Sequence, residues 1–120
     1  MNRWVLLEHT VSNSHINEVH FDLLIEYGSD CLTWKIFEIP KLNGSFIKIF
    51  KQPNHRSVWL SRNQKILSRG RGYVRKIDSG NYFLIKNSLV EDKFSIKLDG
   101  ELMCGTFKKE ADLCKLYKTI

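Results

Sequence analysis

The strongest constraint on the fold of this chain is the alternation of residue types over Val19–Glu26. Every odd-numbered position in this segment is apolar, whereas three of the four even-numbered positions, His20, Asp22 and Glu26, are polar. Successive side chains of a β-strand point to opposite faces, so a repeat of two residues is typical of a strand with one face on a core. The segment therefore predicts a strand that presents His20 and Asp22 together on its other face.

Similar short apolar segments recur along the chain and are separated by turn residues. We expect further strands at Arg3–His9, Leu32–Ile39, Phe46–Lys51, Arg56–Ser61, Gly72–Asp78, Asn81–Lys86, Lys93–Leu98 and Leu102–Lys108. Ser79-Gly80 and Asp99-Gly100 predict hairpins, and Gln52-Pro53-Asn54 predicts a turn. Only Glu110–Lys118 suggests a helix. About nine short strands favour a closed barrel or a sandwich, because an open sheet leaves unprotected edges.

The size of the chain limits it to one domain. With 120 residues, 42% hydrophobic and 27% charged, we expect a single globular domain over residues 1–120 with no room for a separate cofactor domain. The longest apolar run, Trp4–Leu7, is too short to cross a bilayer, so we expect no membrane partner and no secretion signal. Three cysteines without a CxxC spacing favour a cytoplasmic location, and we interpret them as small buried residues.

The excess of positive charge lies in one segment of the chain. The net charge is +6, yet no acidic residue lies between Glu38 and Asp78, and the rest of the chain has nine basic and thirteen acidic residues. The segment has ten basic residues: Lys41, Lys48, Lys51, Arg56, Arg62, Lys65, Arg69, Arg71, Arg75 and Lys76. A localised positive field of this kind favours a polyanion such as nucleic acid, and the aromatic residues within the segment can stack unpaired bases.

His20 and Asp22 are also candidate metal ligands. If the first two strands pair, His9 at the end of Arg3–His9 becomes the natural third ligand. Two imidazoles and one carboxylate with open coordination positions suit Mn²⁺, Fe²⁺ or Zn²⁺ and leave room for water and a phosphate oxygen. The other interpretation is that these residues are polar side chains on a half-exposed strand.

An ordered set of segments resembles the 3′-phosphoesterase domain of bacterial DNA ligase D. The set covers about residues 3–109 and consists of Arg3–His9, Val19–Glu26, Leu32–Trp34, Pro53–Arg56, Arg69–Val74, Asp78–Gly80, Phe94–Leu102 and Gly105–Phe107. The resemblance implies a small, closed or partly closed antiparallel β-barrel with a polar interior pocket. It also implies an enzyme of DNA end repair that uses a divalent metal, typically manganese, to remove 3′-phosphates or 3′-ribonucleosides from nucleic acid. A DNA ligase or another repair protein is the expected partner.

The resemblance assigns roles to particular residues. It places the metal on His9, His20 and Asp22, and it places the phosphate contact on His55, so that His55, His20 and Asp22 form the expected catalytic group. Arg69, Arg71, Tyr73 and Arg75 alternate onto one face of a predicted strand, where they can bind a nucleic acid together with Arg56.

Three features depart from the family pattern. Leu24 stands where the family usually has a phosphate-binding arginine, and Trp59 stands where it has a tyrosine, so we expect both in the pocket wall. Arg56, Arg69 or Arg71 can replace the missing arginine. Ten residues separate His9 from His20, longer than usual, so His15 is an alternative ligand.

These departures keep two other functions open. One is a non-catalytic barrel that binds single-stranded nucleic acid, and the other is a degenerate family member that acts as a protein-interaction module.

Overall fold

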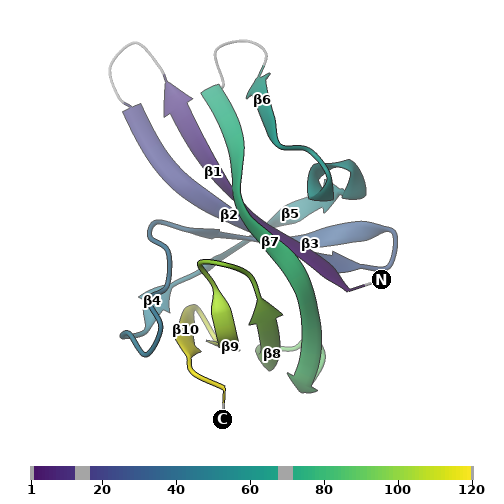
Figure 1. Ribbon diagram of the computed structural model, residues 1–120, viewed down its shortest axis with the longest axis vertical. Helices are drawn as coiled ribbons and strands as arrows, with labels where there is room; N and C mark the ends of the chain where they lie inside the picture. Colours follow the sequence, from purple (N-terminus) through teal and green to yellow (C-terminus); the bar gives the residue numbers. More distant parts are fainter. Residues whose placement is uncertain (1, 13–16, 68–71, 120) are drawn as a thin grey trace.

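The computed structural model describes residues 2–12, 17–67 and 72–119. These residues form ten strands and one short 3₁₀-helix, η1, with Figure 1 showing their arrangement. The elements are β1 (Arg3–Ser12), β2 (Asn17–Tyr27), β3 (Asp30–Ile36), β4 (Ile47–Lys48), β5 (Phe50–Arg56), η1 (Ser57–Leu60), β6 (Gln64–Leu67), β7 (Gly72–Lys86), β8 (Lys93–Asp99), β9 (Cys104–Glu110) and β10 (Leu113–Tyr117). The fold is therefore mainly β, as the alternation of residue types predicts.

The strands form one antiparallel sheet in the order β4-β10-β9-β8-β7-β1-β2-β3-β5, with β6 paired to β7. The long strand β7 belongs to both halves of this sheet, because its first part pairs with β1 and its last part pairs with β8 (Figure 1). Among the described residues no ladder joins the end strands β4 and β5, so the sheet is not closed. Ile49 alone connects these two strands along the chain. Of the expected closed or partly closed antiparallel barrel, the structure shows the antiparallel sheet but not its closure.

The main hydrophobic core lies between the two halves of the sheet. Trp34 on β3 packs against Phe94 on β8 with ring centroids 5.5 Å apart, and Phe94 packs in turn against Phe107 on β9. Trp4 is also fully buried, and its Nε1 donates to the carbonyl oxygen of Asn81 at 2.9 Å. Full burial of each large side chain contributes roughly 1.5–3 kcal/mol. This apolar core fills the inside of the curl, so the polar pocket expected there is not an interior one.

A smaller cluster covers the opposite face of β1 and β2. Val5, Leu7 and Leu24 pack there with Leu60 of η1, and Trp59 lies against them. The register pairs Val5 with Leu24 and Leu7 with Asp22, so one face changes from apolar to polar along the strand pair. The apolar end of this face lies under η1, and at the polar end the largely buried His20 and Asp22 line an open cleft.

The C-terminal segment corrects the prediction of a helix. Residues Leu113–Tyr117 form strand β10, in which Cys114 and Leu116 are buried and the three alternate residues are partly exposed. A burial period of two is the pattern of a strand. Pairing with β9 and β4 therefore determines the conformation of this segment.

Two predicted turns are also wrong. Ser79-Gly80 lies inside the continuous strand β7, where a Cβ on Gly80 would clash with Asp99 Oδ1. The glycine therefore permits a close approach and does not form a turn. Pro53 lies within β5, an end strand of the sheet, where its missing N–H is tolerated. Ser57–Leu60, expected as strand, forms η1. The hairpin at Asp99-Gly100 is confirmed by the pairing of β8 with β9.

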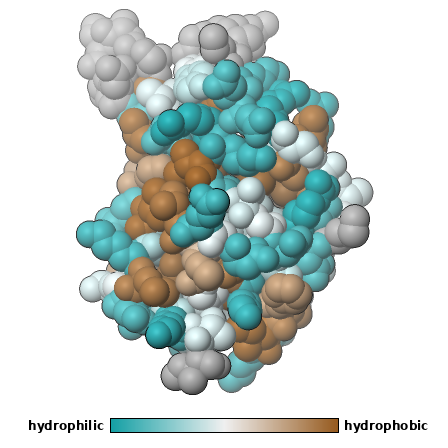
Figure 2. Space-filling view, in the orientation of Figure 1, coloured by the Kyte–Doolittle hydropathy of each residue, from teal (hydrophilic) through white to brown (hydrophobic). Residues whose placement is uncertain are grey.

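The surface carries scattered apolar side chains. Figure 2 shows brown apolar areas separated by teal hydrophilic ones on the face in view. Cys104 is exposed, in contrast to the expectation for all three cysteines, whereas Cys31 and Cys114 are buried. No helix within the described ranges has the length and apolarity needed to cross a bilayer.

Candidate metal centre

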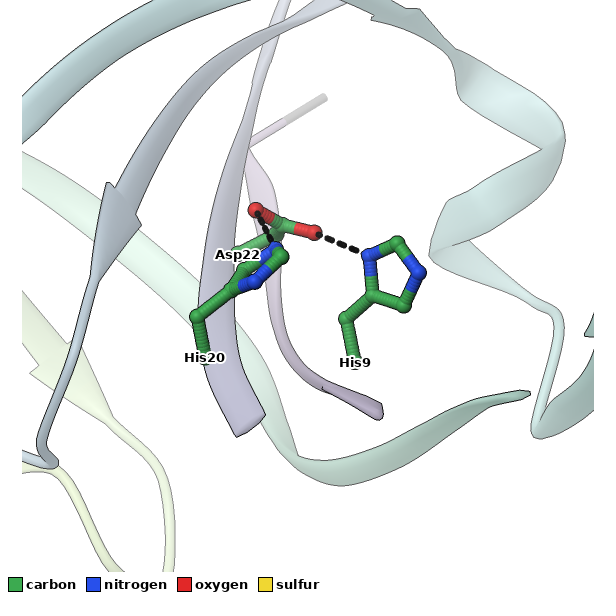
Figure 3. A group of neighbouring side chains, drawn as sticks. All are labelled: His9, His20 and Asp22. Atoms are coloured by element: carbon green, nitrogen blue, oxygen red, sulfur yellow. Dashed lines mark ion pairs between the residues drawn. The ribbon is translucent and has the colours of Figure 1, made fainter. Parts of the chain in front are cut away.

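The pairing of β1 with β2 brings His9, His20 and Asp22 together. His9 lies directly opposite His20 in the antiparallel ladder, and Asp22 is two residues further along β2. Residues two apart share a face of a strand, so all three side chains project from the same side of the sheet. Figure 3 shows the Asp22 carboxylate between the two imidazole rings.

The three groups are close enough to share one ion. Asp22 Oδ1 lies 3.4 Å from His20 Nε2, and Asp22 Oδ2 lies 3.8 Å from His9 Nδ1. One candidate ligand atom from each residue falls within 4.8 Å of the others. Two ligands on opposite sides of one ion lie about 4.2 Å apart, because each bond is about 2.0–2.2 Å long. A small adjustment of side chains is sufficient to bring the three donors onto a single metal.

The environment of His20 fits a metal ligand. Burial lowers the pKa of His20; the Asp22 carboxylate opposes this shift, while the charges of His9 and Lys35 add to it. The neutral imidazole, which is the form that binds metals, is thereby favoured. Its Nδ1 is buried without a hydrogen-bond partner, 3.7 Å from Glu18 Oε1. Metal-ligating histidines commonly have a carboxylate on the ring nitrogen that does not bind the metal.

An open cleft of about 480 Å³ surrounds the three residues. Its other lining residues are Lys35, Gln52, Pro53, Asn54, His55, Arg56 and Trp59. The register explains this composition, because Asp22 pairs with Lys35 on β3, and β3 pairs in turn with β5. His55 Nδ1 lies 3.2 Å from the carbonyl oxygen of Pro53, and the His55 ring is 6.4 Å from the Trp59 ring. Imidazole, ammonium and guanidinium groups therefore share one cleft with the candidate metal ligands.

The structure brings together only some of the residues singled out in the sequence. His55, Arg56 and Trp59 line the cleft, whereas Leu24 is fully buried in the smaller cluster and does not line it. His15, Arg69 and Arg71 lie outside the described residues.

Tyr73 and Arg75 lie on the other face of the sheet. Val74, between them, pairs with His9 and shares its face, so its two neighbours point the opposite way. Arg75 Nη2 forms an ion pair with Glu8 Oε1 at 3.0 Å, and the Tyr73 hydroxyl donates to Gln64 Oε1 at 2.6 Å. These two residues therefore do not contact the metal centre.

Sequence reasoning missed Lys35 and Gln52. Lys35 follows the buried Trp34 directly, so strand alternation alone places it on the face opposite the core. That signal was present in the sequence. The sequence contains no such signal for Gln52, because the residues around Pro53 are typical of a turn.

No protein-family model matches the chain, and a search of curated proteins finds no match.

Proposed function

We propose that this chain is a divalent-metal-dependent phosphoesterase that acts on the 3′ ends of nucleic acid. In this proposal it removes a 3′-phosphate or a 3′-ribonucleoside during DNA end repair in the cytoplasm, with Mn²⁺ as the expected metal and a DNA ligase or repair protein as a partner. The curled sheet serves as a partly closed, barrel-like scaffold. The observation that carries the proposal is the convergence of His9, His20 and Asp22 in an open cleft.

The donor set supports a metal with open coordination positions. Two imidazoles and one carboxylate bind Mn²⁺, Fe²⁺ or Zn²⁺ and leave positions for water and substrate oxygen. A metal bound there would supply charge that polarises a phosphate oxygen and lowers the pKa of a coordinated water.

The remaining cleft residues fit the handling of a phosphate. Lys35 and Arg56 attract and orient the phosphate dianion through charge-assisted hydrogen bonds. They take the role of the phosphate-binding arginine that the ligase D family usually has at the position of Leu24. In the hydrolysis of a 3′-phosphate, a water oxygen adds to phosphorus and gives up one proton, the bond between phosphorus and the 3′ oxygen breaks, and that oxygen takes up one proton. The products are a 3′-hydroxyl and inorganic phosphate. His55 is the candidate donor of that proton, because its imidazole lines the same cleft and can carry a ring N–H.

The proposal is tested by phosphate release from an oligonucleotide that ends in a 3′-phosphate, with Mn²⁺ present. We expect turnover by the unmodified protein and a loss of at least about 100-fold in Asp22→Asn, which keeps the size of the side chain but removes an anionic ligand. Asp30→Asn is the matched control, because Asp30 is exposed and does not line the cleft. Absence of turnover with Mn²⁺, Fe²⁺ and Zn²⁺, or full activity in Asp22→Asn, contradicts the proposal.

A further inference from the structure

Two exposed aromatic side chains lie beside the metal centre. The Phe37 ring is 6.4 Å from the His20 ring, and the Phe50 ring is 5.9 Å from the Phe37 ring, both measured between centroids. The pair is edge to face, with an interplanar angle of 76°. We call Phe37 and Phe50 the aromatic pair.

The register of the sheet directs the aromatic pair toward the metal centre. Phe50 lies opposite Lys35 in the ladder between β5 and β3, and Lys35 in turn lies opposite Asp22. Phe37 follows β3 two residues after Lys35, adjacent to His20. The aromatic pair and the candidate metal ligands therefore lie on one face of the sheet.

Packing of the fold does not explain the aromatic pair. Phe37 is 52% exposed and Phe50 is 40% exposed, and neither belongs to the main core or to the smaller cluster. An edge-to-face contact stabilises two rings by about 0.5–1.5 kcal/mol but leaves much of their surface in water. Ring surface of this kind, next to a polar cleft, is available to a ligand.

A cationic side chain lies against the aromatic pair. The Lys35 ammonium lies 5.3 Å from the centroid of the Phe37 ring and also lines the cleft. Phe50 lies within the segment between Glu38 and Asp78 that has ten basic and no acidic residues. A surface that combines cations with exposed rings complements a ligand that combines phosphates with flat bases.

We propose that the aromatic pair stacks the unpaired bases of a single-stranded 3′ end. This inference rests on the proposed function, in which the terminal phosphate lies in the metal cleft, and it adds a preference for single strands over duplexes. Bases within a duplex are stacked on their neighbours on both sides, so only unpaired bases offer a free face to Phe37 and Phe50. Stacking on a ring tolerates every base, so the preference is for strandedness and not for sequence.

The test is oligonucleotide binding without divalent metal, measured by fluorescence anisotropy in EDTA. The probe is a 5′-labelled strand that ends in a 3′-phosphate, used alone and annealed to its complement as a blunt duplex. Phe37→Leu and Phe50→Leu keep apolar volume but remove the ring, so we expect each to weaken single-strand binding by about 5- to 150-fold. Duplex binding should change by less than about twofold, because it depends on phosphate contacts.

Two control variants separate stacking from other effects. Phe83→Leu changes an exposed phenylalanine on the last part of β7 and should leave both affinities unchanged. Phe37→Trp should retain single-strand affinity, because it restores an aromatic ring. Thermal melting verifies that each variant is folded.

The outcomes distinguish this inference from the proposed function. Unchanged single-strand affinity in both leucine variants, equal losses for strand and duplex, or no single-strand binding by the unmodified protein each overturns the stacking role. Weakened single-strand binding in the variants of a protein that releases no phosphate supports stacking and contradicts the phosphoesterase. Phosphate release by the unmodified protein, together with unchanged single-strand binding in the leucine variants, supports the phosphoesterase and contradicts stacking.

Discussion

Replacement of Asp78 by asparagine should destabilise the fold more than most single substitutions. Asp78 is only 6% exposed and lies on β7 next to the turn between β8 and β9. Its Oδ1 accepts from the backbone N–H groups of Ser79 and Glu101 at 3.0 and 2.9 Å, and its Oδ2 accepts from those of Leu102 and Met103 at 3.0 and 2.8 Å. One carboxylate thereby fixes the turn against the long central strand.

The expected loss of stability in Asp78→Asn follows from the number of backbone hydrogen bonds that the asparagine amide cannot accept. Asparagine retains one acceptor oxygen, so in either orientation its NH₂ group faces two backbone donors. A hydrogen bond to a charged group is worth about 1.5–3 kcal/mol, so the loss of two predicts a decrease of roughly 3–6 kcal/mol in the free energy of unfolding. A domain of this size has about 5–15 kcal/mol in total.

Urea unfolding followed by circular dichroism measures the effect of Asp78→Asn. With a slope of about 2 kcal/mol/M, the midpoint should fall by about 1.5–3 M. The matched control is Glu101→Gln in the same turn, whose exposed side chain should leave stability within about 0.5 kcal/mol. A decrease below about 1 kcal/mol for Asp78→Asn refutes the role assigned to this carboxylate.

Two further predictions concern the buried ionisable groups Glu26, Cys31 and Cys114. Hydrogen bonds from Arg3 lower the pKa of Glu26, so the pair stabilises the fold above the ordinary glutamate pKa, and this contribution is lost as the pH falls through the lowered folded pKa. In urea titrations Glu26→Gln should cost about 1–2 kcal/mol at pH 7, and the cost should shrink steadily as the pH falls below the ordinary glutamate pKa. Burial raises the pKa of Cys31 to about 11 and that of Cys114 to about 12, so a thiol reagent at pH 8 should label one cysteine, Cys104, in the folded chain and three in denaturant; rapid labelling of all three without denaturant contradicts the burial.

The sequence predicts the parts of the fold in which local pattern and tertiary contacts agree. The alternation over Val19–Glu26 correctly places His20 and Asp22 on the face opposite the main core. The helix prediction for the segment that forms β10, Leu113–Tyr117, was wrong because a short apolar pattern fits either a helix or a strand. The strands that pair with this segment include β4, which is distant in sequence. The hairpin predicted at Ser79-Gly80 was wrong because Gly80 is needed for its small size next to Asp99. That contact is distant in sequence and leaves no local pattern.

The sequence predicts the part of the candidate site that lies on strands adjacent along the chain, but not the part that depends on distant strand pairing. His9 could be paired with His20 because only one short connection separates their strands. Phe37 was not singled out because its contact with Phe50 depends on the pairing of β3 with β5, and the segment around Pro53 does not read as a strand. The sequence does not predict that Arg75 faces away from the candidate metal ligands. Its orientation depends on which residues of β7 pair with β1, and a bulge interrupts that ladder.

An anomalous scattering map of crystals soaked in Zn²⁺ or Mn²⁺ shows directly whether His9, His20 and Asp22 hold a metal ion. We predict one strong peak bonded to a nitrogen of His9, a nitrogen of His20 and a carboxylate oxygen of Asp22, with bonds of about 2.0–2.2 Å for Zn²⁺. A map without a peak between these three side chains, or with the ion held by other residues, contradicts this prediction.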